Sequence, residues 1–412
     1  MKLQAPIRPE GQQSVIALRT EPLETVRFGI IGLGSRGANA VRILSSVPDC
    51  RITALCDISD EAVTKCYQTL EGTSEIHQFS GSRDAWKQLC QCPDVDIVYI
   101  CTDWNSHVPV ALYAMGSGKH VALEVPAAST LDEIWSLVDM AEKTRRHCIM
   151  MENCVYDSFE MSTLAMVKAG VFGEIVHAEG AYHHCLDKQW SKWRLEYNRT
   201  SRGDLYPTHG IGPVCQALGI HRGDRMKTLV SMDTSSFNGV KVYESNVGEC
   251  DQFQNADQTD TLIKTANGKT ILMQHNVMTP RPYDRMFKVA GTEGYAGKYP
   301  IEQIYLRSED VQDPKEVGVL YQGDELKKLQ ADYPVEIMTD ELVKLEKPET
   351  PRGDMDFIMF YRLVYCLHNG LPLDMDVYDM AEWCSISELS RLSLENGSVP
   401  VEVPDFTRGE WK

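Results

Sequence analysis

The chain has 412 residues, of which 43% are hydrophobic and 24% are charged, and these proportions are those of a globular protein long enough for two domains. A chain of this size can bury a large apolar core. Its formal net charge of −18 gives little attraction for a nucleic-acid backbone or an anionic membrane, so neither is an expected partner.

Residues 1–25 combine prolines, a glycine and glutamines without a regular apolar period, which predicts an arm along the surface rather than a domain. They also lack the apolar core of a signal peptide, and no later stretch is long and apolar enough to span a membrane. We therefore expect a cytoplasmic protein from the sequence as it stands. An export signal removed ahead of residue 1 would leave no trace in it.

A dinucleotide-binding fingerprint follows the arm. An apolar run at residues 26–31 leads into three glycines, Gly32, Gly34 and Gly37. In this motif the first glycine makes a tight turn, the second lets the backbone approach a pyrophosphate, and the third lets the next helix, expected at 38–46, pack on the sheet. The N–H groups at the start of that helix would face the phosphates.

A second apolar run, at residues 52–56, ends at Asp57. A carboxylate in this position accepts hydrogen bonds from the 2′-hydroxyl of an adenosine ribose. The motif therefore favours NAD over NADP, although a glycine turn without a cofactor is the plainer alternative.

From residue 26 to residue 153, near-continuous apolar runs alternate with helical patterns, which predicts a doubly wound parallel sheet covered on both faces. Strands are expected at 28–31, 52–56, 97–101, 121–124 and 148–152. Further helices are expected at 106–115 and 131–144. Ligands bind beyond the carboxyl ends of such strands, where the polar segments 101–107, 124–126 and 152–153 lie.

After Gly170 the pattern changes to short alternating strands separated by turn signals, which predicts a largely antiparallel sheet. Strands are expected at 174–184, 259–265, 270–277 and 287–290, and closing helices at 355–367 and 380–394. The expected fold is thus α/β, with an arm at 1–25, an NAD-binding Rossmann domain at 26–153 and a substrate-binding α+β domain at 154–412, whose C-terminal helices pack back.

This arrangement resembles the family of glucose–fructose oxidoreductase, inositol dehydrogenase and rhizopine-catabolism proteins (Gfo/Idh/MocA). In ordinary dehydrogenases of that family, the motif after the fourth strand reads Glu-Lys-Pro, and its lysine helps to polarise the group being oxidised. Here the motif is Glu124-Val125-Pro126, so the ammonium group is missing from beside the nicotinamide. Either the chain is inactive, or another group does that work.

Other motifs favour the second possibility, and with them the chain resembles glycoside hydrolase family 109, whose members are NAD-dependent α-N-acetylgalactosaminidases. The motifs are Trp104-Asn105-Ser106-His107, Glu152-Asn153, Tyr182, Trp193-Arg194 and Tyr206-Pro207-Thr208-His209. Tyr206 and His209 lie three residues apart, so a helix beginning at Pro207 would place a phenol and an imidazole on one face. The alternative is that both are ordinary packing residues.

The resemblance implies hydrolysis through redox chemistry. NAD would take hydride from C3 of the sugar, and the resulting ketone would acidify the proton at C2. Loss of that proton would let the aglycone leave from C1, after which water would add and NADH would return its hydride. Such a mechanism needs no pair of catalytic carboxylates, in contrast to ordinary glycosidases.

The residues that the resemblance makes catalytic are Tyr206, His209, Tyr182 and Glu152. Tyr206 and His209 are assigned to O3 and to proton shuttling, and Tyr182 to C2 or to water activation, but which of the three does which stays open. Glu152 would orient one of them or hold a sugar hydroxyl. The implied substrate-binding residues are Tyr182, Arg194, Tyr206, Pro207, Thr208, His209 and Tyr283. Arg194 would donate to hydroxyls or to the acetamide oxygen.

The implied NAD-binding residues are Gly32, Gly34, Ser35, Arg36, Gly37, Asp57, Trp104, Asn105, Ser106, His107, Glu124, Val125, Asn153 and Tyr206. For Trp104 the alternative is a packing aromatic at a strand end, and for His107 a residue at a helix start. The expected partner is a small-molecule glycoside. In this family the second-domain sheet often forms a dimer surface, so a homo-oligomer is a further possibility.

No metal site is expected. The thirteen cysteines include no Cys-x-x-Cys pair, and Cys90-Gln91-Cys92 is too short to be half of a usual zinc site. His183 and His184 are neighbours in a strand and therefore point to opposite faces, so they and Asp204 are improbable joint ligands. Free thiols in a reducing compartment are the simplest interpretation.

Two other functions compete with the glycosidase. A plain NAD-dependent sugar dehydrogenase would release NADH, but Val125 argues against it. A non-catalytic NAD-binding sensor would have no need for Tyr182, Arg194, Tyr206 and His209 together. The preference for α-N-acetylgalactosaminides follows from the family resemblance alone.

Overall fold

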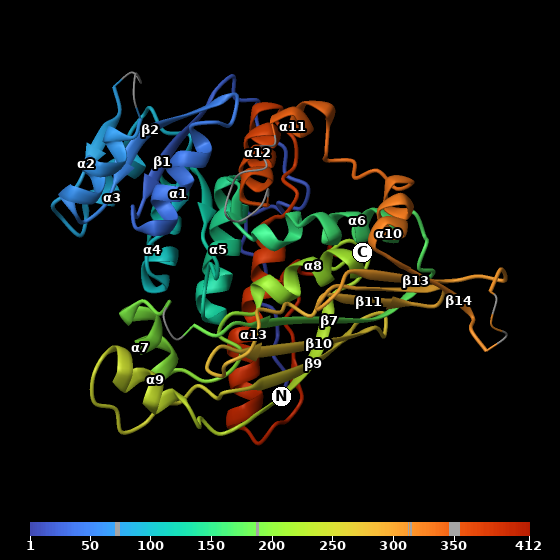
Figure 1. Cartoon of the computed structure of the whole chain (residues 1–412). Helices are drawn as coiled ribbons and strands as arrows, with labels where there is room; N and C mark the ends of the chain where they lie inside the picture. The colour runs from blue at the N-terminus through green and yellow to red at the C-terminus, as the bar shows by residue number, and fades with distance from the viewer. Residues whose placement is uncertain (71–74, 187–188, 312, 314, 346–354) are drawn as a thin grey trace. The chain divides into compact units, whose positions relative to one another are not determined.

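The computed structural model describes residues 1–70, 75–186, 189–311, 313, 315–345 and 355–412 (Figure 1). The chain forms two compact units. One, the parallel-sheet unit, comprises Pro6–Asn153 and Glu341–Cys384. The other, the mixed-sheet unit, comprises Met1–Ala5, Cys154–Asp340 and Ser385–Lys412.

The parallel-sheet unit contains a six-stranded sheet in the order β3-β2-β1-β4-β5-β6, with every neighbouring pair parallel. The strands are β1 (Val26–Ile31), β2 (Cys50–Cys56), β3 (His77–Phe79), β4 (Ile97–Ile100), β5 (His120–Leu123) and β6 (Cys148–Met150). The helices between them are α1 (Ser35–Leu44), α2 (Asp60–Gln68), α3 (Ala85–Gln91), α4 (Trp104–Gly116) and α5 (Leu131–Thr144). This arrangement confirms the predicted Rossmann sheet.

Several boundaries differ from the prediction, and two of these differences affect the segments expected to bind ligands. Helix α1 begins at Ser35 rather than at residue 38, because Gly34 already serves as its extended N-cap. Strand β6 ends at Met150 rather than at 152. Both differences lie at the carboxyl edge of the sheet, so the predicted ligand-binding segments belong to the turns and helix starts at that edge.

The parallel-sheet unit also holds chain segments from outside the expected Rossmann domain. The arm residue Val15 donates its N–H to the Tyr378 hydroxyl at 3.1 Å, and Leu23 donates its N–H to the carbonyl of Leu367 at 3.1 Å. The four residues belong to one unit. The expected organisation placed Val15 and Leu23 in the arm, and Leu367 and Tyr378 in the second domain, whose C-terminal helices it expected to pack back.

The mixed-sheet unit is built on nine strands in the order β14-β13-β12-β11-β7-β10-β9-β8-β15. They are β7 (Ile175–His183), β8 (Met226–Asp233), β9 (Thr259–Thr265), β10 (Thr270–Asn276), β11 (Lys288–Gly291), β12 (Gly294–Gly297), β13 (Gln303–Arg307), β14 (Gly318–Gln322) and β15 (Val401–Glu402). Only the β7–β10 pair is parallel among these neighbours, so the predicted largely antiparallel sheet is confirmed.

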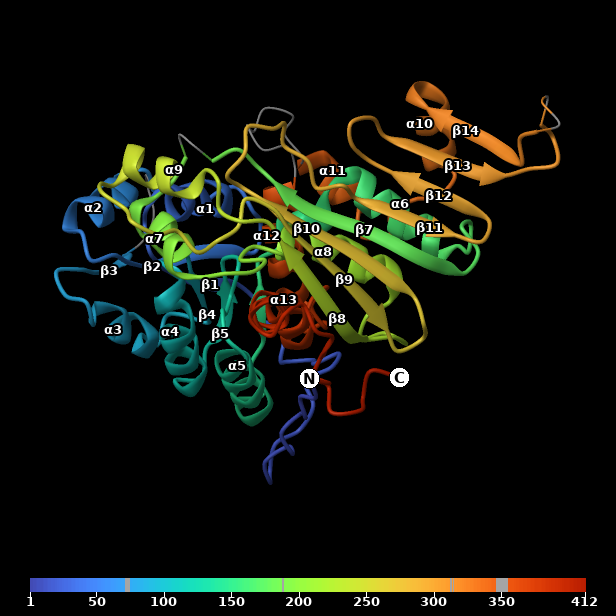
Figure 2. The same ribbon diagram turned by 90° about the horizontal axis from the view of Figure 1, so that it is seen from below.

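Helices α6 (Ser158–Lys168) and α8 (Thr208–Leu218) run along one face of this sheet, and α8 packs on β7, β10 and β11 (Figure 2). The remaining helices are the 3₁₀ helix Asn153–Tyr156, α7 (Lys192–Thr200), α9 (Gly239–Asn246), α10 (Gly323–Ala331), α11 (Asp340–Leu345), α12 (Met355–His368) and α13 (Val377–Glu395). Among the described residues, no helix combines the length and the apolar character that a membrane crossing requires.

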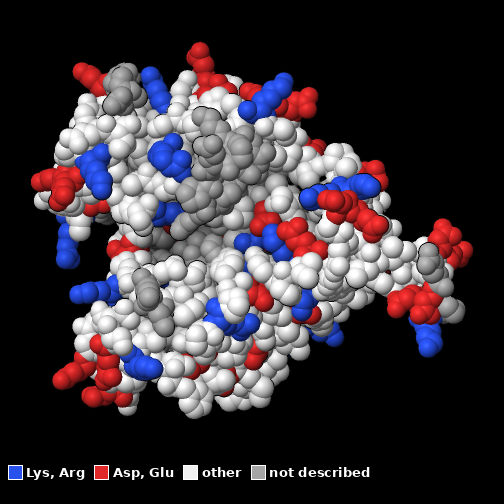
Figure 3. Space-filling model, viewed as in Figure 1, with Lys and Arg blue, Asp and Glu red and all other residues white. Residues whose placement is uncertain are grey.

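Acidic and basic side chains are mixed on the face of the molecule drawn in Figure 3. The Lys and Arg side chains described there stand singly or in small groups among Asp and Glu. The described residues of this face therefore form no broad patch of a single charge.

Candidate active site

The three glycines of the fingerprint have three different surroundings. Gly32 has φ +91°, and a Cβ there would lie 2.7 Å from the Cys101 carbonyl oxygen. A Cβ at Gly37 would lie 1.9 Å from the carbonyl oxygen of Gly32. Gly34 has an ordinary φ of −64°, and a Cβ there would meet no atom within 4 Å. The fold itself requires Gly32 and Gly37, whereas Gly34 leaves open space beside the backbone, which suits a phosphate group.

This difference leads to a prediction for two matched variants. We expect Gly34→Ala to fold with wild-type stability and to bind NAD about tenfold more weakly or worse, because the methyl group would occupy space that the pyrophosphate needs. Gly37→Ala should instead lose stability, by roughly 1–3 kcal/mol, since its methyl group meets backbone. Thermal unfolding and the NAD released from the purified proteins measure both effects. A Gly34→Ala protein with full NAD content would contradict the assignment.

Asp57 is engaged with the same turn. Its Oδ2 accepts the Leu33 N–H at 2.6 Å and its Oδ1 accepts the Ser59 N–H at 2.9 Å. A carboxylate has about four acceptor sites, so two bonds to backbone leave capacity for a ribose hydroxyl. The predicted ribose contact remains a prediction, and the structure adds that Asp57 shapes the glycine turn.

Three of the predicted cofactor residues share one charged network. Arg36 donates from Nε to Glu124 Oε1 at 2.7 Å and from Nη1 to Asp356 Oδ2 at 2.7 Å. Asn153 Nδ2 donates to Asp356 Oδ1 at 2.8 Å, and the Tyr99 hydroxyl donates to Glu124. Burial alone would lower the pKa of Arg36, but Glu124, Tyr99 and Asp356 raise it well above its usual value. The guanidinium is therefore a fixed cation.

Asp356 is a member of this network that sequence reasoning missed. It lies in α12, far along the chain, and its side chain is nearly inaccessible. No local pattern marks it, since an acidic residue in the first turn of a helix is ordinary. Its partners come within reach only because residues 341–384 belong to the parallel-sheet unit.

The His107 ring contacts the backbone of two strand-end segments. Its ring is buried, with Nδ1 3.0 Å from the Pro126 carbonyl oxygen and Nε2 3.2 Å from the Thr102 carbonyl oxygen. Burial lowers its pKa, so the ring is neutral and donates to one of the two. Trp104 is also buried, whereas Asn105 is exposed and the Ser106 hydroxyl donates to Asp103 Oδ2 at 2.9 Å. Their contacts with a cofactor remain predictions, as do those of Ser35 and Val125.

In the mixed-sheet unit, the residues Tyr182, Tyr206 and His209 come together; we call them the Tyr–His triad. The ring centroids of Tyr182 and Tyr206 are 4.6 Å apart, those of Tyr206 and His209 5.0 Å, and those of Tyr182 and His209 5.5 Å. Helix α8 begins at Thr208, one residue after the expected start. The three side chains predicted to exchange protons with the substrate thus form one group.

A close contact between helix and strand produces this convergence. A Cβ at Gly210, in the first turn of α8, would lie 2.5 Å from the backbone N of Ala181 in β7. A Cβ at Gly180 would lie 2.4 Å from the carbonyl oxygen of Gly210. Only a glycine on each side permits this approach, which places His209 beside Tyr182.

Predicted substrate residues surround the triad. The guanidinium carbon of Arg194, in α7, lies 4.5 Å from the centroid of the Tyr206 ring. The Tyr283 ring lies 6.5 Å from that of Tyr182, and the residue as a whole is 41% exposed. Pro207 and Thr208 are buried at the start of α8, and the Thr208 hydroxyl oxygen has no hydrogen-bond partner among the described residues. The mixed-sheet unit therefore gathers all seven predicted substrate residues.

Tyr283 has charged neighbours that no local pattern in the sequence indicates. Arg285 donates from Nη1 to the Tyr283 hydroxyl at 3.5 Å and from Nη2 to Asp157 Oδ2 at 2.9 Å, and it also bonds Glu160. Burial raises the pKa of Glu160 to about 7. Asp157 and Glu160 stand at the N-cap and first turn of α6, a spacing that marks a helix start. That spacing signals the helix, but not the link to Tyr283.

Glu152, the fourth predicted catalytic residue, follows β6 in the parallel-sheet unit, and its side chain is buried. Its predicted task of orienting a triad residue or holding a sugar hydroxyl remains a prediction.

His275 is a further residue near the triad that sequence reasoning missed. It pairs with Tyr182 across β10 and β7, and the two rings stack at 6.4 Å. Burial lowers the pKa of His275 to about 3, so this ring is neutral.

Asp204 supports the backbone before the triad. It is buried, its Oδ1 accepts the Tyr206 N–H at 3.3 Å, and its own N–H donates to Ser390 Oγ at 2.9 Å. Its Oδ2 has no hydrogen-bond partner among the described residues. Burial raises the pKa of Asp204 to about 7. The folded protein therefore keeps a proton on Asp204 at pH values where an unfolded chain releases it.

This proton makes stability depend on pH. Because the folded pKa is raised, the stabilisation is complete below the unfolded pKa near 3.8 and is lost as the pH rises through about 7. Relative to Asp204→Asn, whose amide cannot ionise, wild type should lose roughly 2–3 kcal/mol of unfolding free energy between about pH 5 and about pH 8. Urea unfolding at both pH values measures this. A difference between the two proteins that does not change with pH would refute it.

The chain is similar to known proteins over its whole length. The family model "Glycosyl hydrolase 109, C-terminal domain" matches residues 187–412, and "Oxidoreductase family, NAD-binding Rossmann fold" matches residues 26–152. Glycosyl hydrolase family 109 protein 1 of Bacteroides thetaiotaomicron is 54% identical, with 100% of this chain and 91% of the relative covered. A glycosyl hydrolase family 109 protein of Porphyromonas gingivalis is 53% identical with the same coverage.

Solved structures share the fold at low sequence identity. An NAD-binding oxidoreductase from Klebsiella pneumoniae matches with a TM-score of 0.71 and 18% identity, over 92% of this chain and 99% of that chain. A levoglucosan dehydrogenase in complex with NADH and L-sorbose matches with a TM-score of 0.72 and 16% identity, over 93% and 100%. These matches confirm the predicted combination of a Rossmann domain with a second sheet domain.

Proposed function

Since this chain belongs to glycosyl hydrolase family 109 and has an NAD-binding Rossmann domain, we propose that it cleaves α-N-acetylgalactosaminides through transient oxidation of the sugar at C3. The observation that carries the proposal is the convergence of the Tyr–His triad, with ring centroids 4.6 to 5.5 Å apart. Two phenols and an imidazole at this spacing can reach the same sugar ring.

Two features of the parallel-sheet unit suit the binding of NAD. Gly34 leaves the backbone open beside the N-terminus of α1, and Asp57 is placed at the end of β2 with acceptor capacity left. Bound NAD would supply reversible hydride transfer at C3 of the sugar. The Glu124-Val125-Pro126 segment places no ammonium group at the end of β5, so proton handling falls to other residues of the chain.

The Tyr–His triad would carry out these proton transfers. In our assignment, Tyr206 and His209 take and return the proton of the sugar O3, and Tyr182 takes the C2 proton or activates the incoming water. The positive charge of Arg194 over the Tyr206 ring would stabilise negative charge developing on a nearby oxygen. Tyr283, held by Arg285, would bind a sugar hydroxyl with a fixed phenol.

Hydrolysis of para-nitrophenyl α-N-acetylgalactosaminide in deuterated water tests the proposal. We expect phenol release together with deuterium at C2 of the sugar, and no steady accumulation of NADH, because the redox cycle closes. The β-anomer serves as the matched control. Release without C2 deuterium would leave the glycosidase activity but contradict a C2 base that exchanges its proton with solvent, whereas steady NADH formation from free sugars would indicate a dehydrogenase. No release with any sugar, despite bound NAD, would favour a sensor.

The predicted homo-oligomer through the second-domain sheet also remains a proposal. Leu262 in β9 and Met232 in β8 are 49% and 68% exposed, which supports an apolar contact there. Light scattering after size-exclusion chromatography would measure the mass, and Leu262→Lys should shift a dimer toward monomer.

A further inference from the structure

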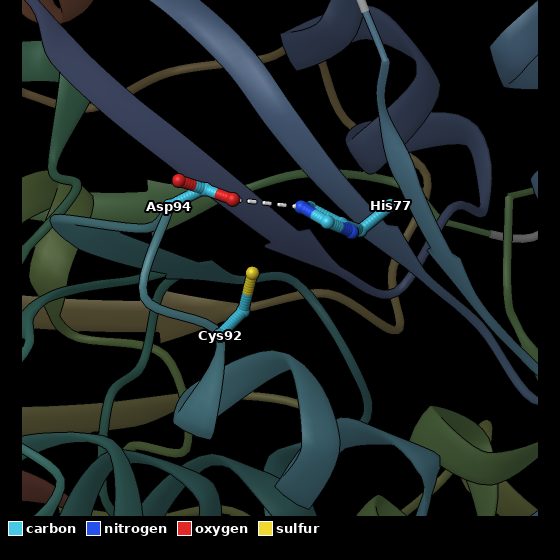
Figure 4. A group of neighbouring side chains, drawn as sticks. All are labelled: His77, Cys92 and Asp94. Atoms are coloured by element: carbon cyan, nitrogen blue, oxygen red, sulfur yellow. Dashed lines mark hydrogen bonds and ion pairs between the residues drawn. The ribbon is translucent and has the colours of Figure 1, made fainter.

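Three potential metal ligands meet in the parallel-sheet unit, and none of them is among the predicted NAD-binding residues. His77, Cys92 and Asp94 each offer one ligand atom, and these atoms all lie within 4.8 Å of one another. His77 Nε2 is 2.9 Å from Asp94 Oδ2, and the Cys92 sulfur points toward the gap that this hydrogen bond spans (Figure 4). We call these three residues the His–Cys–Asp cluster.

We propose that the His–Cys–Asp cluster binds one Zn²⁺ ion, with a water molecule as the fourth ligand. Imidazole nitrogen, thiolate sulfur and carboxylate oxygen are the three donor types that zinc takes from proteins. At ordinary zinc distances, two tetrahedral nitrogen or oxygen ligands lie about 3.3 Å apart. The observed 2.9 Å between His77 and Asp94 has to widen by only a few tenths of an ångström. The ion would take the place of the hydrogen that the two side chains now share at Nε2, and the proton of the Cys92 thiol would pass to solvent.

The backbone already holds the ligands in place. His77 is the first residue of β3 and pairs with Ala54 of β2. Cys92 caps α3, and its carbonyl oxygen accepts from Lys119 Nζ at 2.7 Å. The carbonyl oxygen of Asp94 accepts from the Thr53 hydroxyl at 2.7 Å. The fold thus fixes the backbone of all three ligands, so the ordering that remains on binding is that of the side chains.

The cluster is open on one side. The side chains of His77 and Asp94 are 42% and 53% exposed, whereas Cys92 is buried. A hydrated ion can therefore enter through the imidazole and the carboxylate and lose water as the thiolate binds. A metal site needs a path by which the ion can enter as well as its ligands, and the cluster has both.

Arg27 limits the affinity without closing the site. It donates from Nε and Nη2 to Asp96, at 2.9 and 2.7 Å, and its Nη1 lies 3.5 Å from Asp94 Oδ1. The guanidinium thus sits at the oxygen of Asp94 that faces away from His77, where it would orient the carboxylate. Because a fixed positive charge opposes a nearby cation, we expect a micromolar rather than a nanomolar dissociation constant.

The position of the cluster separates it from the cofactor. Asp94 precedes β4 and His77 begins β3, so the ligands lie toward the amino ends of parallel strands, whereas nucleotides bind at the carboxyl ends. An ion would join the edge strand β3 to the turn before β4. Metal binding should therefore raise the unfolding temperature and be independent of NAD.

Titration of the chelator-treated, NAD-loaded protein with Co²⁺ and then Zn²⁺ tests the proposal. Thiolate-bound Co²⁺ gives a charge-transfer absorption in the near ultraviolet, which Zn²⁺ should abolish at about one equivalent. We expect Cys92→Ser to lose this band, and His77→Gln and Asp94→Asn to weaken zinc binding about tenfold or more. His77→Gln and Asp94→Asn retain hydrogen-bonding groups, so folding should survive.

Cys250→Ser is the matched control, because it removes a partly exposed thiol from the mixed-sheet unit. This variant should leave the Co²⁺ charge-transfer band and the zinc affinity unchanged. The absence of a thiolate band in folded wild type would overturn the proposal, as would a band that persists in Cys92→Ser. Loss of the band in Cys250→Ser would also overturn it, by moving the ion elsewhere.

Discussion

His209→Ala should lower kcat by about 10²–10⁴-fold, the usual loss when a general acid–base group is removed, while KM changes little. The ring centroid of His209 lies 5.0 Å from that of Tyr206 and 5.5 Å from that of Tyr182, so its loss would remove the imidazole to which the proposed mechanism assigns proton exchange. Tyr206→Phe should be similarly impaired. Because the residues act as a unit, the double variant should be little worse than either single one.

Single-turnover measurements can separate the roles within the triad. If His209 and Tyr206 act at O3, their variants lose the transient reduction of NAD as well as C2 exchange. If Tyr182 acts at C2, Tyr182→Phe keeps the reduction of NAD and loses the exchange. Absorbance of NADH and deuterium at C2 report the two steps independently.

His177→Ala is the control for these variants. His177 lies on β7, the strand that also carries Tyr182. Its ring forms a hydrogen bond with the Thr270 hydroxyl at 2.8 Å, and it is not a member of the triad. It should retain wild-type kcat. A His209→Ala enzyme that also retained it would remove His209 from the mechanism, provided that circular dichroism shows both proteins folded.

Gly210→Ala should lose most activity, by about 100-fold or more, although no side chain of the triad is altered. The added methyl group would lie 2.5 Å from the backbone N of Ala181, so α8 must move away from β7 and carry His209 with it. Overpacking of this kind costs roughly 1–3 kcal/mol of unfolding free energy. Urea unfolding and hydrolysis rates should both register the change, while NAD content stays at its wild-type level.

Two further glycine variants separate the effect of moving α8 from a general effect of an added methyl group on folding stability. A Cβ at Gly116, near the end of α4, would meet no atom within 4 Å, so Gly116→Ala should be neutral or slightly stabilising. Gly180→Ala meets the same contact from the β7 side and should repeat the effect of Gly210→Ala. If Gly210→Ala were fully active, the glycine contact would not be what positions the triad.

Much of the candidate site could be predicted from local patterns. The glycine spacing and the acidic end of the second strand identified the Rossmann motif, because turns and helix starts depend on neighbouring residues. The spacing of three between Tyr206 and His209 predicted that the two rings meet, and they lie 5.0 Å apart, although Tyr206 precedes α8 instead of sharing a helix face with His209. Helix α5, predicted at 131–144, has those bounds in the structure, since Thr130 and Glu133 form a capping box.

Contacts between distant segments could not be found in this way. The bond from Arg285 to Tyr283 depends on Asp157 and Glu160, which come from another element, and Arg36 meets Asp356 across most of the chain. His77 was not connected with Cys92 and Asp94, because β3 is a strand of three residues without a periodic pattern. Helix and turn signals are local in sequence, whereas these partnerships depend on strand order, register and packing, which bring together residues that no spacing relates.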